Sequence, residues 1–232
     1  MKISIIDEMK PSIDKTIEKL GKVSFKNDPI VEKEFSKIFS LVGSSQKRHG
    51  TIIENAICEA LKKHKNYEVW SEPKFKISSR VNHMTTNVNN NKKNPDWIDL
   101  LDNNLDYGDS ERTQQVDVVA YDKNRKLITA LEVKRGYSHH DAGKKKKILQ
   151  EILATKLLIK SYGKKLGFEV EQGKAFICSY YGANEFSHLV EISKDGLDEL
   201  FQVEIYEAVE EVNHYYRKRI RELGINWMAS FK

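Results

Sequence analysis

The chain has 232 residues, of which 39% are hydrophobic and 31% charged, a balance that suits a globular domain with enough apolar side chains for a core. The formal net charge of +5 permits a polyanionic partner but does not identify one. Cys58 and Cys178 lack metal-ligand spacing, no apolar run reaches about 18 residues, and the N-terminal run is too short for a signal peptide, so we expect a cytoplasmic protein with free thiols and no membrane span.

Residues 1–45 are predicted to form a helical N-terminal extension. Asp28 and Pro29 supply an N-cap and a first helical position, and Gly43 is expected to end the helix that follows them. Apolar residues recur in it at helical spacing: Ile30, Val31, Phe35, Ile38, Phe39 and Val42. The remaining residues, 46–232, are predicted to form one α/β domain that begins with a second helix over about 50–65, which has one apolar stripe.

The rest of the chain alternates between strand and helix patterns. An asparagine-rich stretch over 80–113 shows no sustained period, and we expect it to be an irregular surface segment beside a bound molecule. The other predicted elements are strands at about 67–78, 115–121, 127–134 and 172–180, a basic helix at 142–162, and a long helix at 196–222 that Gly224 ends. This order predicts a mixed α/β layer fold.

Two acids and a lysine lie in the two apolar strands that flank the polar turn "DKNRK". Glu132 and Lys134 share a strand face because side chains alternate with period two. A two-residue turn at 124–125 would place Asp117 opposite Glu132, and other even-length turns keep the two on one face. An odd turn would put Asp117 opposite Leu131, and the sequence does not decide between these turns.

Two carboxylates that face each other in a partly buried site repel, and one pKa rises unless a cation lies between them. Hard oxygen donors of this kind suit Mg2+, which binds one or two carboxylates together with phosphate oxygens of a substrate. Lys134, two residues along the same face, could hold or deprotonate an attacking water or stabilise charge on a phosphate. The combination predicts metal-assisted phosphodiester hydrolysis.

Asp117, followed after 14 residues by Glu132-Val133-Lys134, resembles the signature of the PD-(D/E)xK nuclease superfamily, which includes many restriction endonucleases. The resemblance implies a restriction endonuclease-like core of helix, three-stranded antiparallel meander, helix and strand over 46–180. It further implies that Asp117, Glu132 and the Val133 carbonyl bind Mg2+, for which Mn2+ can substitute, and that Lys134 serves catalysis. Glu54 resembles an acid on the helix before the first strand. Val116 departs from the pattern, which has proline before the aspartate.

Each of these residues has a structural alternative. Glu132 and Lys134 could form a simple salt bridge on a solvated strand, and Glu54 could cap its own helix in a capping box with Thr51. His139 and its neighbour His140 lack further ligands at zinc spacing, so a phosphate or base contact is expected there. A lysine run at the start of the basic helix could be a solvated face, although lysines there oppose the helix dipole, which favours an external anion.

The expected function is a Mg2+-dependent type II restriction endonuclease that acts on double-stranded DNA as a homodimer, without a nucleotide cofactor. The alternatives are a repair or Holliday-junction nuclease and a catalytically inactive DNA-binding protein of the same fold. The recognition sequence, the cut position and any dependence on DNA methylation stay open. Phosphate contacts are expected from Arg112, Arg135, His139, Lys144, Lys145, Lys146 and Lys147.

Overall fold

The computed structural model describes residues 3–24, 26, 29–90, 97–136, 141–182 and 185–229. The chain divides into two compact units. The helical unit comprises residues Met1–Ala60 and Glu204–Lys232, and the sheet unit comprises residues Leu61–Val203. The boundary predicted after residue 45 falls inside a helix, because α2 runs from Lys33 to Lys62.

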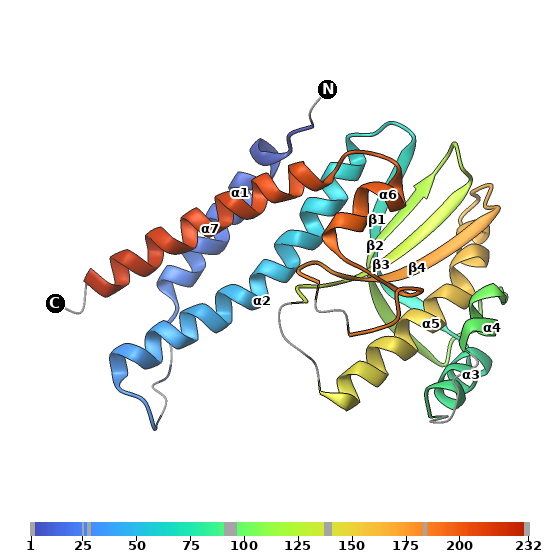
Figure 1. The fold of residues 1–232 in the computed structure, drawn as a ribbon, viewed down its shortest axis with the longest axis horizontal. Helices are drawn as coiled ribbons and strands as arrows, with labels where there is room; N and C mark the ends of the chain where they lie inside the picture. The colour runs from blue at the N-terminus through green and yellow to red at the C-terminus, as the bar shows by residue number, and fades with distance from the viewer. Residues whose placement is uncertain are drawn as a thin grey trace. The chain divides into compact units, whose positions relative to one another are not determined.

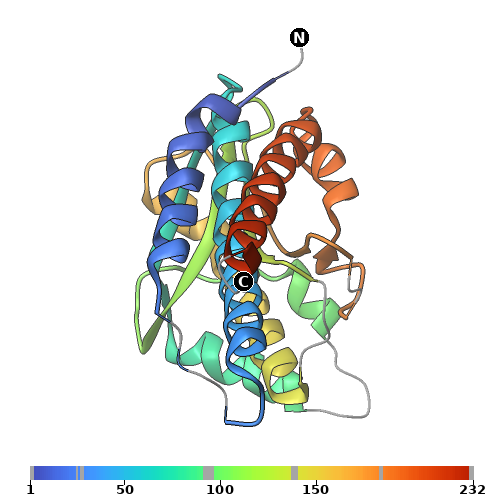
Figure 2. The same ribbon diagram turned by 90° about the vertical axis from the view of Figure 1, so that its left-hand side faces the viewer.

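In the helical unit, α1 (Ile6–Lys22) lies beside α7 (Tyr206–Ala229), as Figure 2 shows. Polar contacts on Asp14 join these two helices. The Tyr215 hydroxyl lies 3.0 Å from both carboxylate oxygens of Asp14, and Arg219 donates to one of them at 2.8 Å. The apolar side chains of α1 that are buried are Met9, Ile13, Ile17 and Leu20.

Helix α2 contacts α7 through a small polar and aromatic cluster. The His49 ring stacks on Tyr216 with centroids 5.1 Å apart, and its Nε2 lies 3.0 Å from Asn213 Oδ1. The Tyr216 hydroxyl donates to the Ser45 carbonyl at 2.9 Å. These contacts bury polar groups with their hydrogen bonds satisfied, which avoids the cost of an unpaired buried group.

The two helices predicted before residue 66 form the single helix α2, so the prediction that Gly43 ends a helix was wrong. A glycine inside a helix costs only about 1 kcal/mol, which the contacts of α2 with α7 can offset. In the first half of α2, the predicted apolar stripe is exposed: Phe35 is 54% and Phe39 is 62% exposed. The residues buried there are Ser36, Leu41 and Ser45. Asp28, the predicted N-cap, lies outside the described residues.

The helix predicted over 196–222 is two helices. Helix α6 (Leu197–Phe201) ends at Gln202, whose φ of 55° is left-handed and interrupts the helix. Helix α7 begins at Tyr206 and continues through Gly224 to Ala229, so the prediction that Gly224 ends it was wrong. None of the helices in the described part of the chain is long and apolar enough to cross a membrane.

The sheet unit holds a five-stranded sheet in the order β1-β2-β3-β4-β5 (Figure 1). The antiparallel pairs are β1 with β2 and β2 with β3, and the parallel pairs are β3 with β4 and β4 with β5. The parallel step from β3 to β4 is made by helix α5 (Ala142–Lys165). The mixed α/β prediction is therefore confirmed. The strands are β1 Tyr67–Ile77, β2 Arg112–Asp122, β3 Leu127–Lys134, β4 Gln172–Ser179 and β5 Glu191–Ile192.

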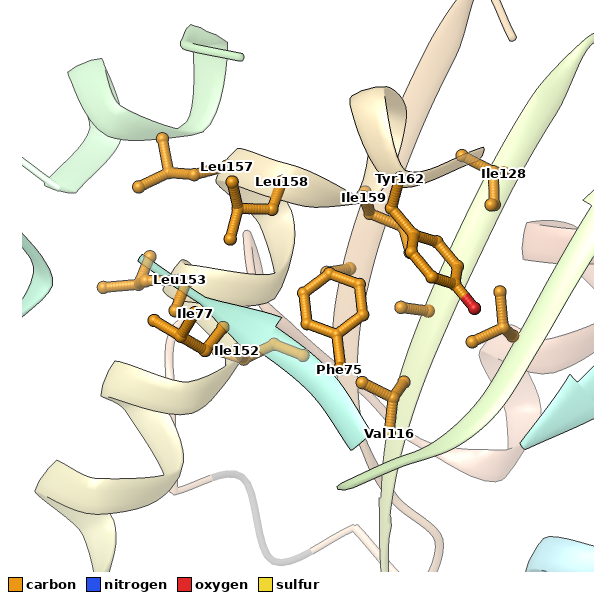
Figure 3. Close-up of a cluster of buried hydrophobic side chains, with 14 of the residues drawn as sticks. Phe75, Ile77, Val116, Ile128, Ile152, Leu153, Leu157, Leu158, Ile159 and Tyr162 are labelled. Carbon is orange, nitrogen blue, oxygen red and sulfur yellow. The ribbon is translucent and has the colours of Figure 1, made fainter. Parts of the chain in front are cut away.

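Apolar side chains of α5 and of one sheet face form the main core of this unit (Figure 3). Ile128 and Ala130 of β3 face this core, so Glu132 and Lys134 continue the same face beyond it. Gly163 allows α5 to approach the sheet closely, because a Cβ there would lie 2.9 Å from Ile128 Cδ1. The residues labelled in the figure include Phe75, Ile77, Val116, Ile152, Leu158 and Tyr162.

The 80–113 segment is not the irregular excursion that was predicted. It contains α3 (Ser79–Asn90) and α4 (Trp97–Asp102), both of which contact α5. Val81 and Thr85 of α3 are buried, and the Thr85 hydroxyl donates to the Val81 carbonyl at 2.9 Å. The asparagines hide this helix in the sequence because they leave too few apolar residues for a recognisable stripe.

Candidate active site

A β-bulge in β2 places the first acid of the site. Trp70 of β1 pairs with Val119 and Glu72 pairs with Val116, so β2 advances three residues while β1 advances two. Asp117 lies within this bulge, and bulges commonly re-aim a side chain beside an active site. Asp117 is 8% exposed, and both oxygens of its carboxylate accept hydrogen bonds. Oδ2 accepts from the Val133 backbone N–H at 2.8 Å and Oδ1 from the Gln115 side chain at 3.0 Å.

The β2–β3 ladder has the register that faces Asp117 toward Glu132. Val118 pairs with Leu131, so the next pair in the same register would be Asp117 with Glu132. The two strands join through four residues, 123–126, because the ladder ends at the pair of Asp122 and Leu127. This even-length turn replaces the two-residue turn considered above and preserves the facing of the two acids.

Glu132 and Lys134 lie side by side on β3, which is an inner strand of the sheet. The Lys134 ammonium donates to Glu132 Oε1, and the two side chains are 25% and 18% exposed. Glu132 and Lys134 therefore form a partly buried ion pair. The alternative interpretation from the sequence was a salt bridge on a solvated strand. The pKa of Glu132 is raised to about 7, because burial, and to a smaller degree Asp117 and Glu151, raise it by more than Lys134 lowers it.

Glu151 of α5 is a third acid near Glu132 that the sequence analysis missed. It acts electrostatically on Glu132, is 23% exposed, and lies 3.8 Å from the Lys147 ammonium, measured from Oε1 to Nζ. The helix was interpreted as a basic helix because of its lysine run. A signal was present, since Glu151 lies between Ile148 and Ile152 on the helix that follows the catalytic strand.

The donor atoms of the site suit Mg2+, although the site holds few acids. Within the described residues, no group of three or more His, Cys, Asp or Glu side chains could hold a metal ion. Mg2+ needs only one or two carboxylates, because water and substrate phosphate supply the remaining oxygens. Burial is the largest cause of the raised pKa of Glu132, and Asp117 and Glu151 add to it, so a bound cation would favour the ionised form of Glu132.

The arginines predicted to contact DNA have partners within the protein. Arg112 donates to Asn82 at 2.9 Å and to Gln114 at 3.2 Å, so it joins β2 to α3. The Arg135 guanidinium lies over the Tyr181 ring, 5.6 Å from its centroid. A direct DNA contact by either arginine stays a prediction, and one by Arg112 would require it to leave these partners.

The lysine run lies in the first two turns of α5. Asp141 caps this helix by accepting from the Lys144 backbone N–H at 2.9 Å. Lys145 pairs with Glu185 at 3.2 Å, and Lys147 lies near Glu151, so these two lysines already face carboxylates. DNA contacts by Lys144, Lys145, Lys146 and Lys147 stay predictions, and His139 lies outside the described residues.

Glu54 lies on α2 in the helical unit. The alternative interpretation, a capping box with Thr51, is wrong, because α2 begins at Lys33 and Thr51 therefore lies inside the helix. The role of Glu54 as a further acid of the metal site stays a prediction.

The comparisons with known proteins give one match. The family model described as "Type II restriction endonuclease, HinfI" matches residues 1–227, which include the Asp117, Glu132 and Lys134 set and most of both units. Neither the curated proteins nor the solved structures include a significant match to this chain.

Proposed function

The chain belongs to the HinfI family of type II restriction endonucleases, a PD-(D/E)xK family, and from that premise we propose that it is a Mg2+-dependent endonuclease of duplex DNA. Family membership implies a DNA endonuclease. The observation that supports the metal is the electrostatic effect of Asp117 on Glu132, from positions that would pair next in the β2–β3 register, with Lys134 on the same face as Glu132.

In the proposed mechanism, Asp117, Glu132 and the Val133 carbonyl hold the ion. A bound Mg2+ would supply Lewis-acid activation of the phosphate and a water of lowered pKa. The Val133 N–H and Gln115 hold the Asp117 carboxylate, which reduces the reorganisation needed for binding. The Lys134 ammonium, which donates to Glu132, could turn from this carboxylate to orient the attacking water or to stabilise the charge that develops on the phosphate.

Plasmid cleavage tests the proposal. Purified protein with Mg2+ should cut a plasmid, and EDTA should abolish cutting. Lys134→Ala should lower the rate about 100-fold or more, since it removes a preorganised cation. Lys123→Ala is the matched control, because Lys123 forms an exposed ion pair with Glu68 and should leave the rate unchanged. A wild-type protein that leaves several DNA substrates intact with Mg2+ and with Mn2+ would contradict the proposal.

Digestion of phage DNA tests the restriction subclass. A type II enzyme reads base edges at a fixed sequence and should yield discrete fragments. Methylation of the recognition sequence by a partner methyltransferase should block them. Faster cleavage of branched DNA than of linear duplex would contradict this subclass and favour a junction-specific nuclease.

We further propose that the chain works as a homodimer that pairs through α2. Phe35, Phe39 and Val42 are 54%, 62% and 45% exposed, and Gln46 is exposed at the next position of the same seam. This spacing of four, three and four residues is typical of a helix that packs against another helix. Exposed apolar side chains that gather in this way mark interaction surfaces.

A second copy of the chain suits this seam because its ends are complementary in charge. An antiparallel pairing of two α2 helices about a two-fold axis near Phe39 would place the exposed Glu32 of one copy beside the exposed Lys47 of the other. The two-fold operation repeats this pair at the opposite end of the seam.

Light scattering after gel filtration tests the dimer. Wild-type protein should have the mass of two chains, and Phe39→Glu should have the mass of one, since it buries a charge in the seam. Leu166→Glu is the control, because Leu166 is 51% exposed in the sheet unit. A wild-type monomer, or a Phe39→Glu dimer, would contradict this interface.

A further inference from the structure

A basic pocket lies in the sheet unit beside α4, α5 and the first half of β4, the orange strand of Figure 1. It has a volume of about 370 Å3 and is open to solvent. Three lysines line it: Lys156 and Lys160, one turn apart on α5, and Lys174 on β4. Its other lining residues include Leu101, Asp102, Asn104, Gly173 and Phe176.

The pocket is separate from the candidate active site. In the β3–β4 ladder, Lys134 pairs with Ser179, five residues beyond Lys174 on the same strand. Strands advance about 3.3 Å per residue, so the two sites lie roughly 17 Å apart along the strands. None of the lysines that line the pocket takes part in the mechanism proposed above.

The three lysines line one pocket, and Lys160 and Lys174 act electrostatically on Lys156. None of them forms an ion pair or a side-chain hydrogen bond with another residue in the described part of the chain. Of the two acids that line the pocket, Glu171 already pairs with Lys126 at 3.3 Å. Burial lowers the pKa of Lys156, Asp102 opposes this shift, and Lys160 and Lys174 lower the pKa further. Asp102 offsets only part of the charge of three lysines, so the pocket keeps a net positive charge.

The edge of β4 adds hydrogen-bond donors to this cluster. Strand β5 pairs only with Ile177 and Cys178, so no strand among the described residues pairs with the start of β4 on that side. The Ile177 N–H points to that side, where it donates to the Val190 carbonyl at 2.7 Å. Backbone N–H groups of successive residues in a strand point to opposite edges. The N–H groups of Gly173 and Ala175 therefore point to the same edge of β4 as that of Ile177.

Gly173 brings this edge and α5 together. A Cβ at position 173 would lie 3.0 Å from both the Cβ and the backbone N of Lys160, which is closer than side chains normally pack. The absence of a side chain thus lets the unpaired strand edge lie directly beside the lysine-bearing turn of α5. Unpaired backbone N–H groups next to ammonium groups are the combination that binds anions in proteins.

We propose that this pocket binds a phosphate group of the DNA backbone, away from the scissile phosphate. The inference rests on the proposed function for the identity of the polyanion. The rise of roughly 17 Å along the strands corresponds to about five base pairs, which is a span that one duplex can cover. The open mouth of the pocket admits a phosphate that is part of a strand, and the apolar lining residues can contact the adjoining sugar.

The double variant Lys160→Gln/Lys174→Gln tests the pocket without DNA. Thermal unfolding of the full chain is measured in EDTA with inorganic phosphate or with chloride at equal ionic strength. Phosphate should raise the melting temperature of the wild type and of a charge-matched control, Lys15→Gln/Lys19→Gln, at two exposed positions of α1. It should not raise that of the pocket variant. An equal response of all three proteins would overturn the proposal.

Duplex binding in EDTA over a range of salt concentrations identifies the ligand as DNA. The slope of log affinity against log salt should become shallower by about one for the pocket variant, which loses one phosphate contact, and stay unchanged for the control. An unchanged slope in the pocket variant would overturn the proposal. So would a free mononucleotide that displaces the duplex at equal phosphate concentration, since the pocket would then be a nucleotide site.

These outcomes separate the pocket from the nuclease proposal. A wild type that cuts DNA, combined with an unchanged salt slope in the pocket variant, overturns the pocket alone. A pocket-dependent slope in a wild type that does not cut DNA overturns the nuclease proposal and supports the pocket.

Discussion

Glu132→Gln should stabilise the metal-free protein, although it removes a proposed metal ligand. Burial and the neighbouring acids raise the pKa of Glu132 from 4.5 to about 7, so the folded state keeps a proton that the unfolded state releases between these pH values. The contribution of Glu132 to stability therefore falls as pH rises through this window. A shift of this size corresponds to about 3 kcal/mol, since one pKa unit is about 1.4 kcal/mol.

Glutamine resembles the protonated acid and cannot ionise, so it avoids this cost. Urea unfolding in EDTA should give the wild type and Glu132→Gln nearly equal free energies of unfolding at pH 4. At pH 8 the variant should be more stable by about 3 kcal/mol. The pKa of about 7, from which this difference is calculated, already includes the effect of the ion pair with Lys134, which lowers the pKa of Glu132.

Metal addition should remove most of this difference in stability. At pH 8 and 100 times its dissociation constant, Mg2+ should stabilise the wild type by about 2.7 kcal/mol, while Glu132→Gln should gain much less. Glu68→Gln is the control, because Glu68 is 46% exposed and should show no such pH-dependent difference. If the stability of the wild type and of Glu132→Gln depended equally on pH, the pKa of Glu132 would not be raised in the folded protein, and the argument would be refuted.

Two further variants separate the structural charges from the catalytic ones. Asp122 is 4% exposed and pairs with Arg125, and although burial raises its pKa, the Arg125 contacts lower it below the usual range. The ionised Asp122 therefore stabilises the fold at neutral pH, and this stabilisation is lost in acid. Asp122→Asn should lower the free energy of urea unfolding by about 2–4 kcal/mol at pH 7 without changing Mg2+ affinity. A loss of stability that is as large in acid as at pH 7 would contradict this pH dependence. Glu151→Gln removes one of the charges that raise the pKa of Glu132, so the pH profile of cleavage should move to lower pH, and an unmoved profile would show that Glu151 does not act on the site.

Local sequence patterns were enough to locate the β2–β3 hairpin and its charged residues. The prediction of a strand over 127–134 matches β3, where a short, mostly apolar run ends in the alternating residues Leu131, Glu132, Val133 and Lys134. Period two also decides that Glu132 and Lys134 share a face, whatever the rest of the fold does. The register with Asp117 needed the structure, because the turn residues permit several loop lengths.

Features that depend on partners distant in sequence were missed. The stripe of Phe35 and Phe39 has helical spacing, but spacing cannot say whether a partner covers it, and here the side chains are exposed. Glu151 approaches Glu132 only because α5 crosses back over the sheet. The lysine pocket likewise requires α5 and β4 to lie side by side at Gly173.

The sequence by itself determined the mixed α/β class and the acid, acid, lysine set, because periodicity and residue chemistry are local properties of the chain. Only the tertiary structure decided which charges face one another and which apolar surfaces stay open to solvent. The physical reason is that burial and electrostatic coupling depend on distances between residues far apart in the chain, which no local pattern contains.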